Sequence, residues 1–421
     1  MYVTRLQLFN FRGARSLSLD FQRRLNVFYG ENGAGKSTVL DAIAIMLSWV
    51  VSRIRHAGSS GRPIGEDDIT IGNSSASIEL TTCWIEGSDV YLQWKVAKTK
   101  AGHQSFGEKS QLYNLNDYTA TMQSLISEKS EQTNLPIFVY YPVNRAVLDI
   151  PLRIREHHSF SLLTAYDDAL TSGANFRMFF EWFREREDIE NESIRRGEPS
   201  PDPQLEAVRS ALTQFLPEFS NLTVRRSPLR MEVDKNGKTL IVNQLSDGEK
   251  CLIAFIGDLA RRLAIANPGS TIPLQYGTGI VLVDEIDLHL HPKWQRIVVP
   301  KLLQVFPNCQ FFISTHSPSI LTHVNKENIY SLKLTNDGIV AEQPEASFGM
   351  NVDRIMEELM ELPTTRPDEV EEQLHEMYVA IDDGALEQAR EQIAKLKEKI
   401  GQDSELAKAE VLIRRKEIIG K

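Results

Sequence analysis

The sequence of 421 residues predicts an α/β fold that carries an antiparallel β lobe, a helical insertion and a C-terminal helical module. Short apolar runs that end in glycine or acidic residues alternate with segments of helical periodicity, which is typical of a sheet covered by helices. Near the N-terminus, apolar and polar residues alternate in the manner of paired strands. After residue 352, apolar residues recur every three or four positions, as in amphipathic helices.

The composition indicates a globular protein whose core needs no crosslinks. Apolar residues make up 42% of the chain, and the formal net charge of −10 argues against binding nucleic acid through bulk charge. Cys83, Cys251 and Cys309 lie far apart, so neither a disulfide framework nor a zinc site is indicated. The first residues lack the apolar segment of a signal peptide, and no run of roughly 18 apolar residues occurs. We therefore expect a cytoplasmic protein without a membrane span.

The first half of the chain is expected to consist mainly of strands around one long helix, which follows the third strand. Residues 101–134 are polar and weakly patterned. The expected strands share alternating or continuous apolar residues, and they lie at residues 3–9, 11–21, 25–29, 76–100 (as a hairpin) and 135–141.

The second half is expected to return to mixed helices and strands. Helices are expected at residues 155–215, 247–267 and 292–306, and strands at 222–226, 229–243, 279–283, 310–314 and 329–334. Asn236 and Gly237 are expected to form a hairpin turn. Three amphipathic helices follow after residue 352, with Asp382, Asp383 and Gly384 ending the first of them.

These elements predict four regions. Residues 1–150 form the first half of the α/β head with the β lobe, and residues 151–220 form a helical insertion. Residues 221–350 form the second half of the head, and residues 351–421 form a C-terminal helical interaction module.

Residues 30–38, which we call the phosphate loop, read GENGAGKST between a predicted strand and a predicted helix. Glycines let backbone N–H groups approach phosphate oxygens, and the following helix adds the positive end of its dipole. Lys36 is placed for the β- and γ-phosphates and Ser37 for Mg²⁺, so the loop predicts an ATP–Mg²⁺ site. The residues expected to contact the nucleotide are Gly30, Asn32, Gly33, Gly35, Lys36, Ser37 and Thr38.

An acidic pair ends a predicted strand in the stretch GIVLVDEID. Ligands of open α/β sheets bind at the carboxyl ends of strands, where Asp284 and Glu285 are expected. Asp284 is expected to hold Mg²⁺ with its water shell. Glu285 is expected to be catalytic, as the general base toward the attacking water.

The stretch QLSDGEK at residues 244–250 opens a long predicted helix. Ser246 and Glu249 have the S-x-x-E spacing of a capping box, which satisfies free N–H groups at a helix end. A helix end of this kind also suits an anion. Binding of a γ-phosphate by Ser246, Gly248 and Glu249 is therefore a second prediction, compatible with the first.

The order of these motifs resembles the SMC, RecF and OLD branch of the ABC ATPases, so the fold is expected to be an ABC/SMC-type P-loop ATPase head. GENGAGKST, LSDGE, VLVDE and STHSP follow one another as they do in that group. The resemblance implies that LSDGE contacts ATP across a dimer of heads and that DLHLHP is the D-loop region. It also implies that His316 is the switch histidine that senses the γ-phosphate, which we assign to catalysis beside Glu285.

The sequence departs from members of this group in three respects, and the last two exclude particular branches. No glutamine marks a Q-loop, and Asn144 and Arg145 lie near its expected position. No D-x-D set follows His316, so a Toprim nuclease is not expected, and residues 150–244 are too few for a long coiled coil. We expect His289 and His291 at the dimer surface rather than as a metal pair.

Three further stretches are similar to the PtuA family of ATPases from Septu anti-phage systems and related retron operons. They are FVYYPVNRAVLDIPLRI, ANFRMFFEWFREREDIENE and LIRRKEIIGK. The resemblance implies a homo-oligomer of at least paired heads and a partner nuclease of the PtuB-like HNH type. The ATPase is expected to control this nuclease through its nucleotide state and to reach DNA through the complex.

Two other functions are compatible with the ATP motifs: a RecF-like or SMC-like DNA-repair ATPase without a nuclease partner, and a nuclease that acts alone. The C-terminal helices are likewise open to two interpretations. They pack against the head, or they dock the partner or a second copy of the chain.

Overall fold

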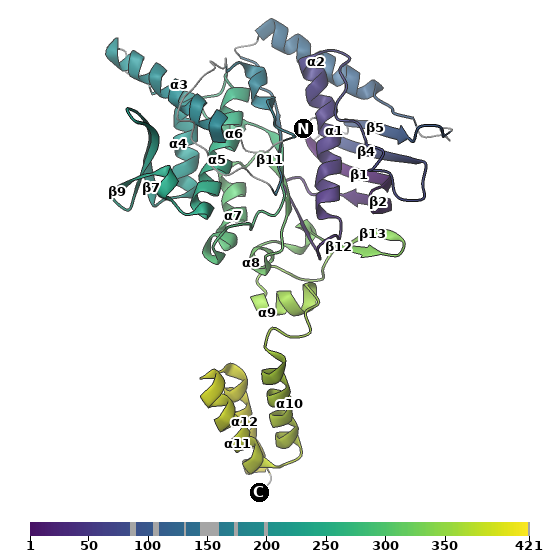
Figure 1. The fold of residues 1–421 in the computed structure, drawn as a ribbon, viewed down its shortest axis with the longest axis vertical. Coiled ribbons are helices and arrows are strands. Elements are labelled where there is room, and N and C mark those ends of the chain that lie inside the picture. Colours follow the sequence, from purple (N-terminus) through teal and green to yellow (C-terminus); the bar gives the residue numbers. More distant parts are fainter. Residues whose placement is uncertain are drawn as a thin grey trace. The chain divides into compact units, whose positions relative to one another are not determined.

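The structure is a computed structural model that describes residues 1–84, 90–103, 109–129, 132–143, 160–171, 176–197 and 201–419 (Figure 1). The chain divides into two compact units, Met1–Met350 and Asn351–Lys421. The finer division of the first unit near residues 150 and 220 stays a prediction.

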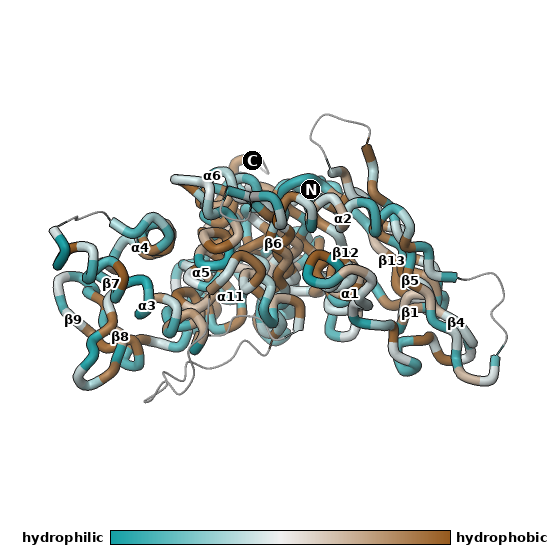
Figure 2. Tube along the Cα trace, turned by 90° about the horizontal axis from the view of Figure 1, so that it is seen from above, coloured by the Kyte–Doolittle hydropathy of each residue, from teal (hydrophilic) through white to brown (hydrophobic). Residues whose placement is uncertain are grey.

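A six-stranded sheet forms the core of the first unit. Its strand order is β13 (Gly338–Glu342), β12 (Ile329–Thr335), β3 (Leu25–Tyr29), β11 (Cys309–Ser314), β10 (Gly279–Val283) and β6 (Ile137–Tyr141). All neighbours pair in parallel except β12 and β13. The four strands β3, β6, β10 and β11 are buried along their whole length, as expected for parallel strands with helices on both faces. Figure 2 shows apolar residues concentrated around β6 and β12 and hydrophilic residues around β9 (Lys238–Ile241).

Two long helices cover the central sheet from opposite sides, α1 (Lys36–Arg55) and α5 (Asp247–Ala266) (Figure 1). Helix α1 is the described helix that is long and apolar enough to cross a membrane, yet 67% of its apolar window is buried within the protein. Its apolar residues are therefore explained by its place in the core. Ser246 caps α5, as the capping box predicts.

An antiparallel sheet forms the N-terminal lobe, with the strand order β2 (Ala14–Asp20), β1 (Tyr2–Phe11), β4 (Ser75–Cys83) and β5 (Tyr91–Thr99). This confirms the predicted N-terminal strand pair and the hairpin at residues 76–100. Helix α2 (Tyr113–Lys129) packs against β5 and α1 in a stretch whose sequence predicted no element.

A second β lobe lies beside α3 (Phe176–Arg195) and α4 (Pro203–Phe215). It has three strands, β7 (Phe219–Arg226), β8 (Leu229–Lys235) and β9, rather than the two that the sequence predicted. The expected turn at Asn236 and Gly237 joins β8 to β9. Both residues have positive φ, as a type I′ turn requires. The structure also describes in this unit the α-helices α6 (Pro273–Tyr276), α7 (Pro292–Val305) and α8 (Pro318–Leu321), and 3-10 helices at Leu162–Tyr166, Val242–Gln244 and Lys326–Asn328.

The second unit contains the short helix α9 (Val352–Arg354) and three longer helices, α10 (Asp368–Asp382), α11 (Leu386–Ile400) and α12 (Ser404–Ile419). The three longer helices bury a shared apolar core, which confirms the predicted amphipathic helices. This core contains Val370, Leu374, Met377, Ala380, Ile381, Ala389, Ile393, Leu396, Leu406, Ala409 and Ile413. The structure as a whole confirms an α/β head with an antiparallel lobe and a helical C-terminal module.

Candidate functional site

Three motif-bearing loops begin at the carboxyl ends of three neighbouring strands. The phosphate loop follows β3, His316 comes two residues after β11, and Asp284 comes directly after β10. These strands pair in parallel in the order β3, β11, β10, so the three loops lie at one edge of the sheet. Ligands of α/β sheets bind at this edge.

The glycines of the phosphate loop have backbone conformations that side chains rarely adopt. Gly30, Gly33 and Gly35 all have positive φ. A Cβ atom on Gly30 would collide with the carbonyl oxygen of Leu332 on β12, and one on Gly35 would collide with the side chain of Ile339 on β13. A Cβ atom on Gly33 would meet open space. The loop therefore packs closely against β12 and β13 at two of its three glycines.

Lys36 begins α1, and its side chain folds back over the loop. Its Nζ donates hydrogen bonds of 2.9 Å to the carbonyl oxygens of Gly30 and Glu31. Burial lowers the pKa of Lys36, while nearby carboxylates oppose this shift. The ammonium group therefore lies in the electrostatic field of the acidic residues after β10. The opposing carboxylates are those of Asp284, Glu285 and Asp287.

Asp284 is buried, and hydroxyl groups from its two neighbouring strands approach it. The hydroxyl of Ser314 donates to its Oδ1 atom, and the hydroxyl of Tyr140 lies 3.4 Å from Oδ2. The next residue, Glu285, has a φ of 47°, in the left-handed region. Its backbone N–H donates to the Oγ atom of Ser314 over 2.7 Å. The acidic pair is thus attached to β11 through one serine.

The segment after β11 is tied to the loop after β10. The hydroxyl of Thr315 donates to Oδ1 of Asp287 over 2.6 Å, and the N–H of His316 donates to the same oxygen over 3.3 Å. His316 is half-buried at this edge. Sequence reasoning singled out His316 but missed Ser314 and Thr315. The available signal was two polar residues that follow the apolar run of β11.

The remaining nucleotide-contact residues of the N-terminal half lie in or beside the phosphate loop. Asn32 and Ser37 are exposed, and Thr38 is half-buried in the first turn of α1. Ser37 offers a hydroxyl oxygen and Asp284 offers carboxylate oxygens, and oxygen ligands suit Mg²⁺, which takes few protein ligands in addition to phosphate oxygens and water. Ser37 and Asp284 thus fit the predicted metal site. Among the residues that the structure describes, no group of three or more His, Cys, Asp or Glu side chains could hold a metal without a nucleotide.

The N-terminus of α5 carries the predicted signature residues. The N–H of Glu249 donates to the hydroxyl of Ser246 over 3.4 Å, and the N–H of Ser246 donates to the Glu249 carboxylate over 3.0 Å. Burial alone would raise the pKa of Glu249, but hydrogen bonds from Lys235 and Ser246 lower it below its usual value. Glu249 therefore caps its own helix, and its assignment as a nucleotide contact stays a prediction.

Within one chain, this helix end contacts the loop after β10. The atoms nearest to Gly248 belong to His289 and Leu290, and a Cβ atom on Gly248 would lie 2.5 Å from the carbonyl oxygen of His289. Ser246 is exposed. The structure therefore brings the phosphate loop, the acidic pair and His316 to one edge. It leaves the signature residues exposed or half-buried beside the D-loop region.

The expectations for the Q-loop position and for His289 and His291 at the dimer surface stay predictions. Asn144 and Arg145 lie outside the described residues. His289 has a φ of 63°, and the Nδ1 atom of His291 accepts a hydrogen bond from the N–H of Lys293 at the start of α7. The His291 side chain thus caps a helix.

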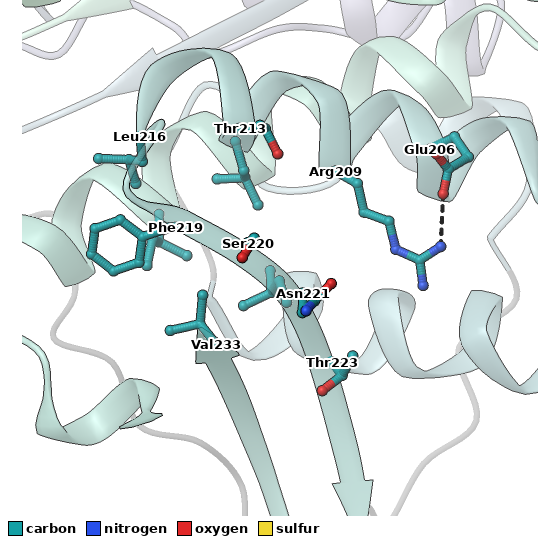
Figure 3. Close-up of a pocket in the computed structure, with 12 residues that line it drawn as sticks. Glu206, Arg209, Thr213, Leu216, Phe219, Ser220, Asn221, Thr223 and Val233 are labelled. Carbon is teal, nitrogen blue, oxygen red and sulfur yellow. Dashed lines mark hydrogen bonds and ion pairs between the residues drawn. The ribbon is translucent and has the colours of Figure 1, made fainter. Parts of the chain in front are cut away.

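A separate cavity of about 390 Å³ lies between α4, β7 and β8 (Figure 3). None of the predicted site residues lines it. Its one cationic side chain, Arg209, pairs with Glu190 and Glu206. The cavity is thus distinct from the candidate nucleotide site.

Comparisons with known proteins give matches over most of the chain. An AAA domain model matches residues 5–220, and a second AAA domain model matches residues 130–322. The retron Ec83 probable ATPase of Escherichia coli is 32% identical over 96% of this chain and 84% of that protein. Septu protein PtuA of Bacillus thuringiensis is 23% identical over 91% of this chain and 90% of that protein. A crystal structure of SmcHead bound to the C-winged helix domain of ScpA is 15% identical over 82% of this chain and 98% of that chain, with a TM-score of 0.48.

Proposed function

Because this chain belongs to the family of ATPases that includes the retron ATPases and Septu protein PtuA, we propose that it controls a partner HNH nuclease through ATP binding and hydrolysis in an anti-phage defence complex. One observation carries the proposal of ATP chemistry. The phosphate loop, the acidic pair and His316 lie at the same edge of the sheet. The carboxylates after β10 favour the charged form of Lys36 there.

The chemistry follows from the residues at this edge. Backbone N–H groups of the loop bind phosphate oxygens, and Lys36 turns from the loop carbonyl groups to the β- and γ-phosphates. Ser37 and Asp284 would hold Mg²⁺, which when bound neutralises charge on the phosphate oxygens. Glu285 accepts a proton from the attacking water, and His316 contacts the γ-phosphate.

A second copy of the chain completes the site in this proposal. The N-terminus of α5 presents Ser246 and Gly248 with the positive end of a 20-residue helix. The exposed position of Ser246 suits it to a γ-phosphate held by the phosphate loop of another head. Because ATP would then join the two heads and hydrolysis would release them, the nucleotide state sets an assembly that a partner can sense.

The proposed contact with the nuclease lies on the C-terminal module. Val411 and Ile418 of α12 are exposed by 64% and 76%, although α12 buries other apolar residues in the core of the module. They are seven positions apart and so share one helix face, which also carries Arg414 and Arg415. An apolar stripe flanked by cations suits a partner surface with apolar and acidic groups.

Two substitutions test the ATP site. Lys36→Ala should abolish ATP binding. Glu285→Gln should bind ATP but lose turnover and accumulate joined heads, as measured by nucleotide binding, phosphate release and size-exclusion chromatography with light scattering. Glu342→Gln on β13, which removes an exposed carboxylate, should behave like the parent. Hydrolysis by Glu285→Gln at the parental rate would refute the catalytic assignment.

Co-purification tests the partner. A neighbouring HNH protein should be retained by the full-length chain in an ATP-dependent manner, and Val411→Asp should weaken this retention without changing ATP turnover. A chain that purifies without such a partner and binds duplex DNA tightly in a salt-sensitive manner would favour the repair function instead.

A further inference from the structure

The ends of β10 and β11 bring two polar side chains together. The strands pair in parallel with Val283 opposite Ile313, so the next residues, Asp284 and Ser314, come level at the edge of the sheet. Both side chains are buried. Ser314 is therefore a buried hydroxyl group directly beside the acidic pair.

The hydroxyl group of Ser314 forms two hydrogen bonds, one as a donor and one as an acceptor. Its proton is donated to Oδ1 of Asp284, and its oxygen accepts the N–H of Glu285 over 2.7 Å. A serine hydroxyl has one proton and two lone pairs, so the two hydrogen bonds are compatible. A single side chain thus fixes the carboxylate of Asp284 and the backbone of Glu285.

The backbone of Glu285 requires such support. Its φ of 47° lies in the left-handed region, which is uncommon for residues other than glycine, asparagine and aspartate. The direction of the Glu285 side chain depends on this conformation. The hydrogen bond from its N–H to Ser314 is therefore a constraint on where its carboxylate lies.

We infer that Ser314 is a positioning residue for ATP hydrolysis, because its hydroxyl holds Asp284 and Glu285 in the relative orientation that turnover needs. The inference rests on the proposed function and deepens it. Ser314 acts through these two residues rather than on ATP, so its removal affects turnover more than nucleotide affinity.

The backbone hydrogen bonds around Ser314 hold its strand in place independently of its side chain. Its carbonyl oxygen accepts the N–H of Ile286 over 3.1 Å, and the N–H of Thr315 donates to Phe28 on β3 over 3.0 Å. These backbone hydrogen bonds do not depend on the side chain, so Ser314→Ala leaves the strand pairing in place.

Steady-state kinetics with the full-length protein test the inference. Ser314→Ala should lower kcat for ATP hydrolysis on the order of 10- to 100-fold, because small displacements of catalytic groups have effects of this size. The KM for ATP and the directly measured ATP affinity should change about twofold or less. Ser314→Thr, which keeps the hydroxyl, should recover most of the lost kcat, and Ser314→Cys should lie between the two.

A matched control separates positioning from general loss of stability. Ser347 is also buried, and its hydroxyl donates to the carbonyl oxygen of Val324 over 2.6 Å, away from the acidic pair. Ser347→Ala should keep the parental kcat. In a Glu285→Gln background, adding Ser314→Ala should cause a smaller loss than it does in the parent, because one of the two residues through which Ser314 acts no longer serves as a base.

The outcomes distinguish this inference from the function on which it rests. An inactive Glu285→Gln variant together with a fully active Ser314→Ala variant would overturn the inference and leave the proposed function intact. Equal losses of kcat in Ser314→Ala and Ser314→Thr would also overturn it. A parental rate in Glu285→Gln would instead remove the proposed catalytic assignment itself.

Discussion

Tyr140 and Tyr141 are neighbours on β6, and their hydroxyl groups approach carboxylates on different elements. Tyr141 donates to Oδ2 of Asp258 on α5 over 3.0 Å, whereas the hydroxyl of Tyr140 lies 3.4 Å from Oδ2 of Asp284. Successive side chains of a strand point to opposite faces, which explains the divergence. Strand β6 thus links the acidic edge of the sheet to the helix that begins after Ser246.

We expect Tyr141→Phe to destabilise the protein more than Tyr140→Phe. Asp258 is fully buried, so loss of one donor to its carboxylate should cost about 1–3 kcal/mol. The longer contact of Tyr140 should contribute less, about 1 kcal/mol or under. Urea denaturation of the two variants measures the difference. Equal stability of the two variants would contradict the hydrogen bond between Tyr141 and Asp258.

Asp258 lies between two buried arginines of the same helix. Arg261 donates to its Oδ1 atom over 2.6 Å and Arg262 donates to Oδ2 over 2.7 Å. Arg262 also donates to the carbonyl oxygens of Ala165 and Asp167. Asp258→Asn should lower the free energy of unfolding by about 3–5 kcal/mol, because it leaves buried guanidinium groups without their counter-ion. Denaturant titration at pH 7 measures this loss.

The same substitution has a defined pH dependence. Burial would raise the pKa of Asp258, but Arg262 and Arg261 outweigh it and hold the pKa below the ordinary value of 3.8. The stabilisation is therefore present above pH 3.8 and is lost as the pH falls through the lower pKa of the folded state. The difference between Asp258→Asn and the parent should shrink only in strong acid. Asp337→Asn, at an exposed position, should leave the free energy of unfolding at pH 7 close to that of the parent.

Local patterns made much of the fold predictable. The strand β3, the phosphate loop and α1 form one continuous signal, and Ser246 with Glu249 marks the start of α5 within four residues. Helix α2 escaped prediction because its buried residues Leu115, Tyr118 and Met122 are few among polar ones. Strand β13 was not predicted, because it is a five-residue edge strand with exposed positions.

The candidate site was predictable only as separate segments. The sequence indicates that the acidic pair and His316 each follow a strand, but the pairing of Asp284 with Ser314 depends on β10 and β11 being neighbours in the sheet. The position of β3 between β11 and β12 is likewise a property of the folded chain. Strand order arises from tertiary packing, which no local pattern encodes.

Two glycines of the phosphate loop should differ sharply in their tolerance of alanine. Gly30→Ala places a methyl group against the carbonyl oxygen of Leu332, a backbone atom that cannot move aside without shifting β12. We expect a loss of ATP affinity on the order of 100-fold or more, together with about 2–4 kcal/mol of stability. Isothermal calorimetry and thermal unfolding measure the two effects.

Gly33→Ala is the matched comparison within the same loop. Its methyl group would enter open space, so only the positive φ opposes the substitution, at about 1–2 kcal/mol. ATP affinity should fall less than in Gly30→Ala. A larger loss in Gly33→Ala than in Gly30→Ala would contradict the close packing of the loop against β12.

We expect Lys36 to lower the stability of the folded protein when no nucleotide is bound. We expect the same residue to be required for stabilisation by ATP. Its side chain is buried, and burial lowers its pKa below the ordinary value of 10.5. The charged form is thus disfavoured in the folded state. This cost is fully present below the folded pKa and is relieved as the pH rises toward 10.5. Lys36→Met should therefore match or exceed the parent in thermal stability near pH 7, and its advantage should shrink as the pH approaches 10.

With ATP and Mg²⁺ added, the parent should become more stable than Lys36→Met. Binding to the folded state alone stabilises by about 2.7 kcal/mol at 100 times the Kd, so the Tm of the parent should rise while that of Lys36→Met stays constant. Lys301 is a suitable control, because it also donates to two carbonyl groups, those of Gln214 and Phe215, and burial also lowers its pKa. Lys301→Met should keep the full response to ATP. A rise in Tm with ATP in Lys36→Met equal to that of the parent would show that the phosphate loop binds nucleotide without its lysine.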